Sequence, residues 1–106
     1  MNDLMRPSLY SARHKIENLV ESSEKKDLYS VVGPVCETAD SFGSDFEVSA
    51  NAGDYLVVYS AGAYGSSMGS NYNTRLKPAE ILVDQKSHKV IRKAETFDDL
   101  IKEEEL

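Results

Sequence analysis

The pair Cys36-Glu37, with Asp40 three residues further on, is the part of this sequence whose residue types could do chemistry. A cysteine beside carboxylates can serve as a nucleophile, a proton donor or a metal ligand. Neighbouring negative charges disfavour a thiolate, which argues against a nucleophile and for a proton donor. A buried cysteine that acts only as a small hydrophobic residue fits the same spacing. The residues alone leave both interpretations open.

Three further side chains are candidates for ligand contact. Arg6 and Tyr10 place a guanidinium and a phenol on one stretch that we expect to be extended, and arginine is suited to bidentate capture of a carboxylate. Tyr64 has only small neighbouring side chains, so its phenol projects beyond them and could contact a ligand. A surface arginine and packed tyrosines would show the same pattern.

Other catalytic patterns are not supported. His14 and His88 lie far from each other and from Cys36, so no metal site is predicted. Residues 65–69 match the G-x-S-x-G motif of serine hydrolases, but that motif requires a helix directly after it. We predict no helix there and interpret the match as chance.

Length and composition describe one small domain. The chain has 106 residues, of which 41% are hydrophobic and 28% charged, so a soluble globular fold is expected. This length cannot hold a complete α/β barrel. No apolar run is long enough for a membrane helix, and one cysteine fits a reducing, cytoplasmic setting without disulfides.

The charge is unevenly distributed along the chain. The formal net charge is -6, and residues 95–106 carry -5 of it. The first 94 residues are therefore nearly neutral, with -1. Because basic residues form no cluster, we predict no nucleic-acid partner.

The candidate site residues must be positioned by short secondary-structure elements, most of which the sequence predicts to be strands. Residues 54–61 predict a strand buried on both faces, whereas the glycine-rich segment that follows predicts neither helix nor regular strand. Residues 79–83 and 90–93 predict a hairpin, with His88 in its turn. Thr96 and Asp99 fit a capping box that begins a short helix over 97–104. The pattern indicates a small all-β barrel or sandwich.

Five blocks in the same order resemble the diaminopimelate decarboxylase family. They are Asn2-Asp3-Leu4 with Arg6-Pro7-Ser8-Leu9-Tyr10, then Val32-Gly33-Pro34-Val35-Cys36-Glu37-Thr38-Ala39-Asp40, Gly62-Ala63-Tyr64-Gly65, Ser70-Asn71-Tyr72-Asn73-Thr74-Arg75 and Pro78-Ala79-Glu80. The resemblance covers essentially the whole chain, but only the C-terminal part of that enzyme. It implies a Greek-key β-barrel of the alanine-racemase C-terminal type with a short C-terminal helix. Residues 1–106 would form this single domain, with 93–106 as the acidic terminal helix.

The resemblance also implies an activity and partners. The family uses pyridoxal phosphate to decarboxylate meso-diaminopimelate, a small diamino acid, to L-lysine in lysine biosynthesis. It combines an N-terminal α/β barrel domain with this C-terminal domain, and two subunits form a homodimer.

The same resemblance implies a role for each matching residue. Arg6 and Tyr10 contact the substrate, Arg6 near the carboxylate that is retained. Cys36 lies near the reacting carbon as a candidate proton donor, and Glu37 recognises the distal amino-acid centre. Both reach into the active site of the other subunit. Tyr64 lies beside the cofactor phosphate and the substrate.

None of the eight lysines lies in a motif that matches the cofactor lysine of the family, which belongs to the N-terminal barrel. We therefore expect a C-terminal fragment that neither binds the cofactor nor decarboxylates by itself. In the family this domain also borrows a strand from the N-terminus of the full enzyme, so we expect an exposed sheet edge. In the matching segment, Gly62 and Gly65 are expected to let the backbone approach the phosphate.

Two other functions fit the residues. One is a domain of a related ornithine or arginine decarboxylase, although Glu37 favours diaminopimelate because those relatives tend to carry Asp after the Cys. The other is a non-catalytic interaction module that complements a barrel encoded as a separate chain.

Overall fold

The protein consists of short strands and short helices, and the computed structural model describes residues 1–21 and 25–105. The strands in these residues are β1 (Ile16–Asn18), β2 (Asp27–Val32), β3 (Ser41–Val48), β4 (Leu56–Val58), β5 (Glu80–Asp84) and β6 (Ser87–Arg92). The helices are α1 (Arg6–Tyr10), α2 (Gly62–Met68), the 3₁₀ turn η1 (Tyr72–Thr74) and α3 (Phe97–Ile101).

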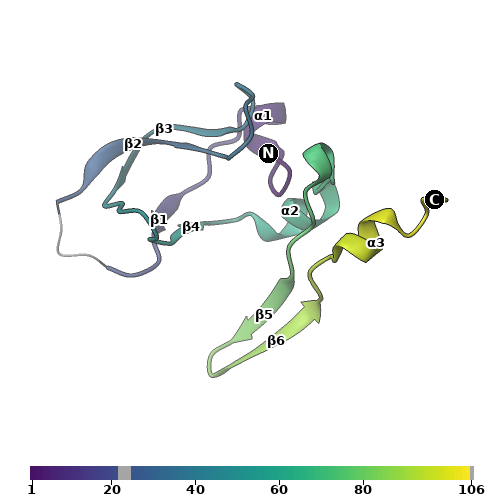
Figure 1. Cartoon of the computed structure of the whole chain (residues 1–106). Helices are drawn as coiled ribbons and strands as arrows, with labels where there is room; N and C mark the ends of the chain where they lie inside the picture. The colour runs from purple at the N-terminus through teal and green to yellow at the C-terminus, as the bar shows by residue number, and fades with distance from the viewer. Residues whose placement is uncertain (22–24, 106) are drawn as a thin grey trace.

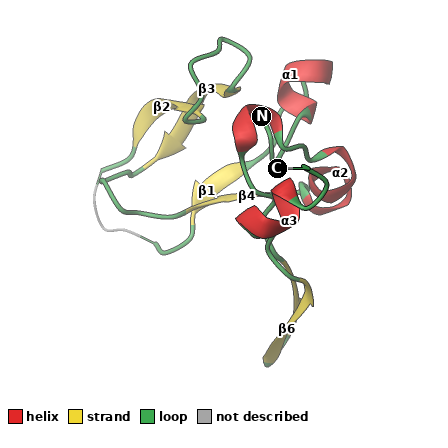
Figure 2. Ribbon diagram, turned by 45° about the vertical axis from the view of Figure 1, so that its right-hand side comes forward, coloured by secondary structure: helices red, strands yellow, loops and turns green. Residues whose placement is uncertain are grey.

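The strands pair as three antiparallel ladders, β1 with β4, β2 with β3 and β5 with β6 (Figure 1). The β5–β6 hairpin projects away from the other two ladders, as the rotated view also shows (Figure 2). Within the described residues the three ladders do not join into a closed barrel. The sequence predicts an all-β domain with one short C-terminal helix. The predominance of strands is confirmed, but α1, α2 and η1 are additional short helices. The Greek-key barrel stays a prediction.

Two irregularities bend the ladder of β2 and β3. The register shifts between Tyr29 and Val31 and again between Val31 and Val32. Gly43, which pairs with Val31, has φ 116°, a backbone conformation that glycine adopts without steric cost. Bulges of this kind bend a strand, and β3 lies against α1 in this structure.

The hydrophobic core is small, and most of it lies where the β1–β4 ladder meets the β2–β3 ladder. Its buried apolar residues are Leu4, Ile16, Phe46 and Val48. Polar bonds reinforce the contact, because Asn18 of β1 both donates to and accepts from the backbone of Ser49.

Arg13, in the segment before β1, makes a second connection to β3. Its guanidinium donates to the backbone oxygens of Ser44 at 3.0 Å and Asp45 at 3.2 Å. It also lies 4.4 Å from the ring centroid of Phe46, where it gains a cation–π contact. Arg13 thus attaches the segment before β1 to β3 through both hydrogen bonds and a ring contact.

The expected buried strand over residues 54–61 is largely wrong. The observed strand β4 has three residues of intermediate burial, and the flanking Tyr55 and Tyr59 are 75% and 42% exposed. Two causes are visible. Among the described strands β4 pairs only with β1, and Ser60 adopts φ 56°, which ends the extended conformation.

The glycine-rich segment forms helix α2, which is a correction to the sequence prediction. Tertiary contacts stabilise it where helix propensity does not. One such contact is the hydrogen bond that the Ser66 hydroxyl donates to the carboxylate of Glu80 at 2.6 Å. At the end of the helix, an added Cβ at Gly69 would lie 2.9 Å from the carbonyl oxygen of Gly65. A larger residue at position 69 is therefore sterically excluded.

Arg6–Tyr10 is also a helix rather than an extended stretch. Pro7 favours this first turn because its fixed φ suits a helix start, and Ser11 ends the turn with φ 54°. The predicted hairpin is confirmed as β5 and β6, but His88 lies in β6 and not in the turn.

The terminal helix is confirmed, with a shorter range than expected. The capping box between Thr96 and Asp99 is present, with the Asp99 N–H donating to the Thr96 hydroxyl at 3.2 Å. The helix ends at Ile101, before the run of glutamates that opposes its dipole. None of the helices in the described part of the chain is long and apolar enough to cross a membrane.

Candidate functional site

Helices α1 and α2 bring Arg6 and Tyr64 together, although 57 residues separate them in the sequence. The Arg6 guanidinium lies over the Tyr64 ring, 4.9 Å from its centroid. Tyr64 is 51% exposed, so the pair lies at the surface. A guanidinium that lies over an aromatic ring is bound through its face, so N–H donors at its edge can still bind an anion. The pair is therefore suited to bind a carboxylate or a phosphate.

Tyr10 lies on the same helix as Arg6, one turn further along. Residues four apart on a helix lie on one face. Tyr10 is 62% exposed, so its side chain is accessible on the helix face that carries Arg6.

Cys36 and Glu37 lie on the loop that connects β2 to β3, and the buried Asp40 organises this loop. The backbone N–H of Gly33 donates to the Asp40 carbonyl at 2.8 Å. The Val35 N–H donates to the Asp40 carboxylate at 2.8 Å, and the Asp40 N–H donates to the Glu37 carbonyl at 3.0 Å. The loop is thus cross-linked by hydrogen bonds on both sides of Cys36.

The environment of Asp40 favours its charged form. The Met1 ammonium binds one oxygen of its carboxylate. That bond and the Val35 N–H lower the pKa of Asp40 against the opposing effect of burial. Asp40 also explains why residue 33 is glycine, because an added Cβ there would lie 2.2 Å from the Asp40 carboxylate.

The loop presents Cys36 to solvent, since the thiol is exposed. The interpretation of Cys36 as a buried small hydrophobic residue is therefore wrong. Glu37 is half-buried and accepts a hydrogen bond from the hydroxyl of Tyr72, a residue of η1. The structure thus places an accessible thiol next to a carboxylate that is held in place.

The loop and the Arg6–Tyr64 pair are connected through α1. The Ser8 hydroxyl donates to the backbone oxygen of Ala39, which attaches α1 to the loop, and the two lie side by side in Figure 1. Among the described residues no hydrogen bond, ion pair or ring contact joins Arg6 or Tyr64 to Cys36 or Glu37. The five predicted residues therefore form two separate clusters, which α1 connects. One holds Arg6, Tyr10 and Tyr64, and the other holds Cys36 and Glu37.

Tyr72 is a functional candidate that our sequence reasoning missed. The Ser70–Arg75 block marks it, but a tyrosine between two asparagines carries no chemical signal of its own. Its bond to Glu37 depends on a contact between residues that lie 35 positions apart.

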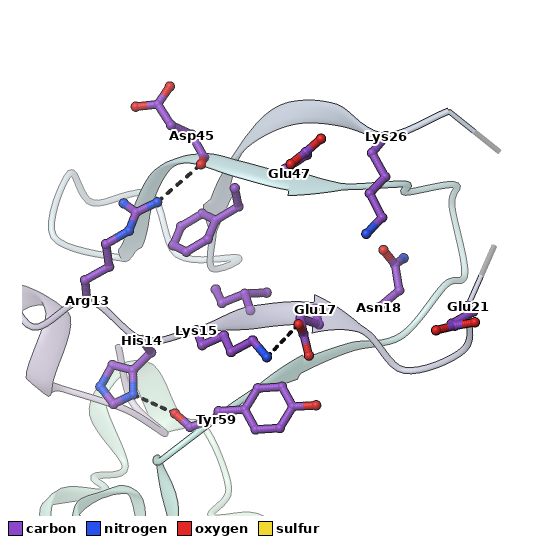
Figure 3. Close-up of a pocket in the computed structure, with 12 residues that line it drawn as sticks. Arg13, His14, Lys15, Glu17, Asn18, Glu21, Lys26, Asp45, Glu47 and Tyr59 are labelled. Carbon is purple, nitrogen blue, oxygen red and sulfur yellow. Dashed lines mark hydrogen bonds and ion pairs between the residues drawn. The ribbon is translucent and has the colours of Figure 1, made fainter. Parts of the chain in front are cut away.

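A separate cavity of about 1020 Å³ lies between the ladder β1–β4 and the ladder β2–β3 (Figure 3). None of the five predicted site residues lines it. Acidic and basic side chains are mixed along its wall, and Lys15 is bound to Glu17 at 2.7 Å while Arg13 is bound to the β3 backbone. The cavity thus presents no concentrated charge to a small ligand.

Comparison with known proteins identifies relatives across the chain. The family model of the pyridoxal-dependent decarboxylase, C-terminal sheet domain, matches residues 1–62. The diaminopimelate decarboxylase of Neisseria meningitidis serogroup B is 50% identical over 99 residues, which are 92% of this chain and 24% of that protein. The protein of the same name from Aquifex aeolicus is 47% identical over 95% of this chain and 24% of its own length.

Solved structures agree with these relatives. The crystal structure of diaminopimelate decarboxylase from M. jannaschii in co-complex with L-lysine has a TM-score of 0.92 and 41% identity, and the match covers all of this chain and 24% of that one. The Helicobacter pylori enzyme complexed with L-lysine has a TM-score of 0.88 and 43% identity, over 98% of this chain and 26% of that one. The chain spans about a quarter of the length of these relatives.

Proposed function

Because this chain belongs to the pyridoxal-dependent decarboxylases, whose C-terminal sheet domain it matches, we propose that it is the substrate-recognition domain of a diaminopimelate decarboxylase. The proposed reaction converts meso-diaminopimelate to L-lysine and carbon dioxide, with pyridoxal phosphate as the cofactor. The observation that carries this proposal is that the domain presents both a guanidinium over an aromatic ring and a carboxylate on a cross-linked loop.

These two groups match the two charges at the distal end of the substrate. Diaminopimelate carries an ammonium and a carboxylate at each end. Arg6 binds the carboxylate that the reaction retains, because a guanidinium can donate two parallel bonds to it. Glu37 accepts a hydrogen bond from the distal ammonium. The exposed Tyr10 hydroxyl makes a further contact to the substrate from the Arg6 helix.

Cys36 supplies a proton to the reacting carbon. When bound, pyridoxal phosphate would supply the electron sink that loss of the carboxylate from this carbon requires. The electron pair that remains on the carbon takes the proton of the Cys36 thiol and forms a C–H bond. The resulting thiolate regains a proton from water. The exposed position of Cys36 supports this role.

Tyr64 contacts the cofactor phosphate as well as the substrate. A phenol donor beside the Arg6 cation suits a phosphate group.

Gly62 and Gly65, which were expected to let the backbone approach the phosphate, have different surroundings. A Cβ at Gly62 meets open space, whereas a Cβ at Gly65 would lie 3.3 Å from the backbone oxygen of Asp3. Gly65 therefore serves the packing of α2 on the N-terminal segment.

In the proposed homodimer each active site combines the Arg6 cluster of one subunit with the Cys36–Glu37 loop of the other, so the two clusters of one chain serve different sites. Arg6, Tyr10 and Tyr64 face the α/β barrel domain of the same subunit, whereas Cys36 and Glu37 reach into the site of the second subunit of a homodimer. The division of the residues into two clusters supports this arrangement. The exposed thiol of Cys36 suits the reducing cytoplasm, where we place the enzyme.

We also propose that residues 1–106 form one domain and that its ladders belong to a Greek-key β-barrel. β1 and β3 face each other across the cavity of Figure 3. Arg13 binds the β3 backbone at Ser44 and Asp45, and Asn18 binds the backbone of Ser49, directly after β3. An additional strand between β1 and β3 would join the two ladders into one sheet.

The test is a chimera in which this chain replaces the matching C-terminal quarter of the Neisseria meningitidis enzyme. We expect it to form lysine from meso-diaminopimelate. Replacing Glu37 by alanine removes a hydrogen bond to a charged group, which lowers kcat/KM by roughly 30-fold. A folded, dimeric chimera without activity would overturn the proposed function. Unchanged kcat/KM in Glu37→Ala would overturn the assignment of Glu37.

A further inference from the structure

The turn that carries Tyr72 has an unusual backbone. Asn73 and Thr74 adopt φ 58° and 59°, in the left-handed region that favours glycine. For the β-branched Thr74 this conformation is a genuine outlier. Backbone of this kind persists only where the surrounding structure determines it, and it concentrates at functional sites.

The surroundings hold this turn from the N-terminal side. Asn2 is buried, with 3% exposure, and its side-chain amide donates to the backbone oxygen of Tyr72. The backbone oxygen of Asn2 accepts from the Ser70 N–H at 3.1 Å. Asn2 thus binds the chain on both sides of residue 71.

The segment after β6 holds the same turn from its other side. The Glu95 carboxylate accepts from the side chain of Asn71 and, at 2.9 Å, from the N–H of Lys77. The Asn71 amide also donates to the backbone oxygen of Arg75 at 3.0 Å. Residues from both ends of the chain therefore fix the position of Tyr72.

The phenol of Tyr72 contacts the β2–β3 loop, which carries Glu37. Its hydroxyl donates to Oε1 of Glu37. The bond to Glu37 raises the pKa of Tyr72, and the charges of Glu37 and Cys36 and burial act in the same direction. The phenol therefore remains a donor throughout the neutral range. A carboxylate has two oxygens with about four acceptor positions, so Glu37 keeps capacity for a second partner.

We propose that Tyr72 is a positioning residue that orients the Glu37 carboxylate, so that its remaining acceptor positions receive the distal ammonium of a diamino acid substrate. The position of Tyr72 is built by Asn2 and Glu95, and its action passes through Glu37. This inference rests on the proposed function for the identity of the ammonium. The hydrogen bond itself can be tested independently of that function.

The first experiment uses the chain as it is. Tyrosines labelled with ¹³C in the ring are titrated by NMR, and the Tyr72 signal is identified by its loss in Tyr72→Phe. Replacing Glu37 by alanine is expected to lower the pKa of Tyr72 toward the ordinary tyrosine value. A Tyr72 signal that titrates identically with and without Glu37 overturns the proposal.

The second experiment uses the chimera described above. Tyr72→Phe keeps the ring and removes only the hydroxyl. We expect KM for meso-diaminopimelate to rise about tenfold with kcat changed less than about twofold, since one hydrogen bond to a charged group is lost in binding. In the Glu37→Ala background, Tyr72→Phe is expected to have no further effect, because the residue acts through Glu37.

The matched control is Tyr55→Phe, which removes the same atom from a side chain that is 75% exposed beside β4. It is expected to leave KM and kcat unchanged. An unchanged KM in Tyr72→Phe, or effects of Tyr72→Phe and Glu37→Ala that multiply in the double variant, would overturn the positioning role. If the unsubstituted chimera is inactive, the proposed function fails, and the titration still decides whether Tyr72 binds Glu37.

Discussion

Replacing Gly33 by alanine tests whether Asp40 organises the Cys36–Glu37 loop. A Cβ at residue 33 would lie 2.2 to 2.4 Å from all three atoms of the Asp40 carboxyl group. Carbon and oxygen atoms cannot approach so closely, and Asp40 is 2% exposed, so its side chain has little room to move aside. The carboxylate must therefore leave its position.

The loss of stability follows from the bonds that the displaced carboxylate gives up. The Val35 N–H loses a charge-assisted partner at 2.8 Å, and one such bond contributes about 1.5 to 3 kcal/mol. The bond from the Met1 ammonium to the same carboxylate is disturbed as well. We expect Gly33→Ala to lower the free energy of unfolding by about 3 kcal/mol.

Urea unfolding followed by circular dichroism measures this change on the full chain, and amide exchange of Val35 reports on the loop directly. Gly62→Ala is the matched control, because its added Cβ meets nothing within 4 Å. At that helical position alanine is expected to leave the stability unchanged or to raise it by up to about 1 kcal/mol. If Gly33→Ala is as stable as Gly62→Ala and Val35 keeps its protection, our account of the loop is refuted.

Two further predictions concern titratable and capping groups. The lowered pKa of Asp40 means that its stabilising contribution is complete above the unfolded value of about 3.9 and is lost as the pH falls through the lower folded value. Asp40→Asn should therefore show a smaller difference in unfolding free energy between pH 7 and pH 3 than the unsubstituted chain, and an equal difference would contradict this. Thr96→Ala removes the N-cap of α3, which costs about 1 kcal/mol. Because the Thr96 hydroxyl is the first cause of the lowered pKa of Asp99, NMR should show this pKa rising in the variant, and an unchanged Asp99 titration would disprove the capping role.

Local chemistry made part of this fold predictable from the sequence. The β5–β6 hairpin and the capping box of Thr96 and Asp99 depend on residues that are close in the chain. Turn residues and caps act on their own backbone, so their effect does not require knowledge of distant contacts.

Other elements depend on contacts between distant parts of the chain, and there the sequence prediction was wrong. Helix α2 is rich in glycine and is stabilised by its contact with Glu80 of β5. The predicted long strand is only β4, because in the described residues it has a single partner of three residues. Propensity does not predict such outcomes, since the deciding interactions are tertiary.

The sequence by itself determined which side chains this domain offers: a guanidinium, three phenols, a thiol and a carboxylate, in blocks that identify the family. Only the tertiary structure decided how they combine. It stacked Arg6 on Tyr64, exposed Cys36, and placed Tyr72 against Glu37 through a turn that both ends of the chain hold in a conformation unfavourable for its residues. The physical reason is that bonds between residues far apart in the chain form only when packing brings them together, whereas residue types are present before the chain folds.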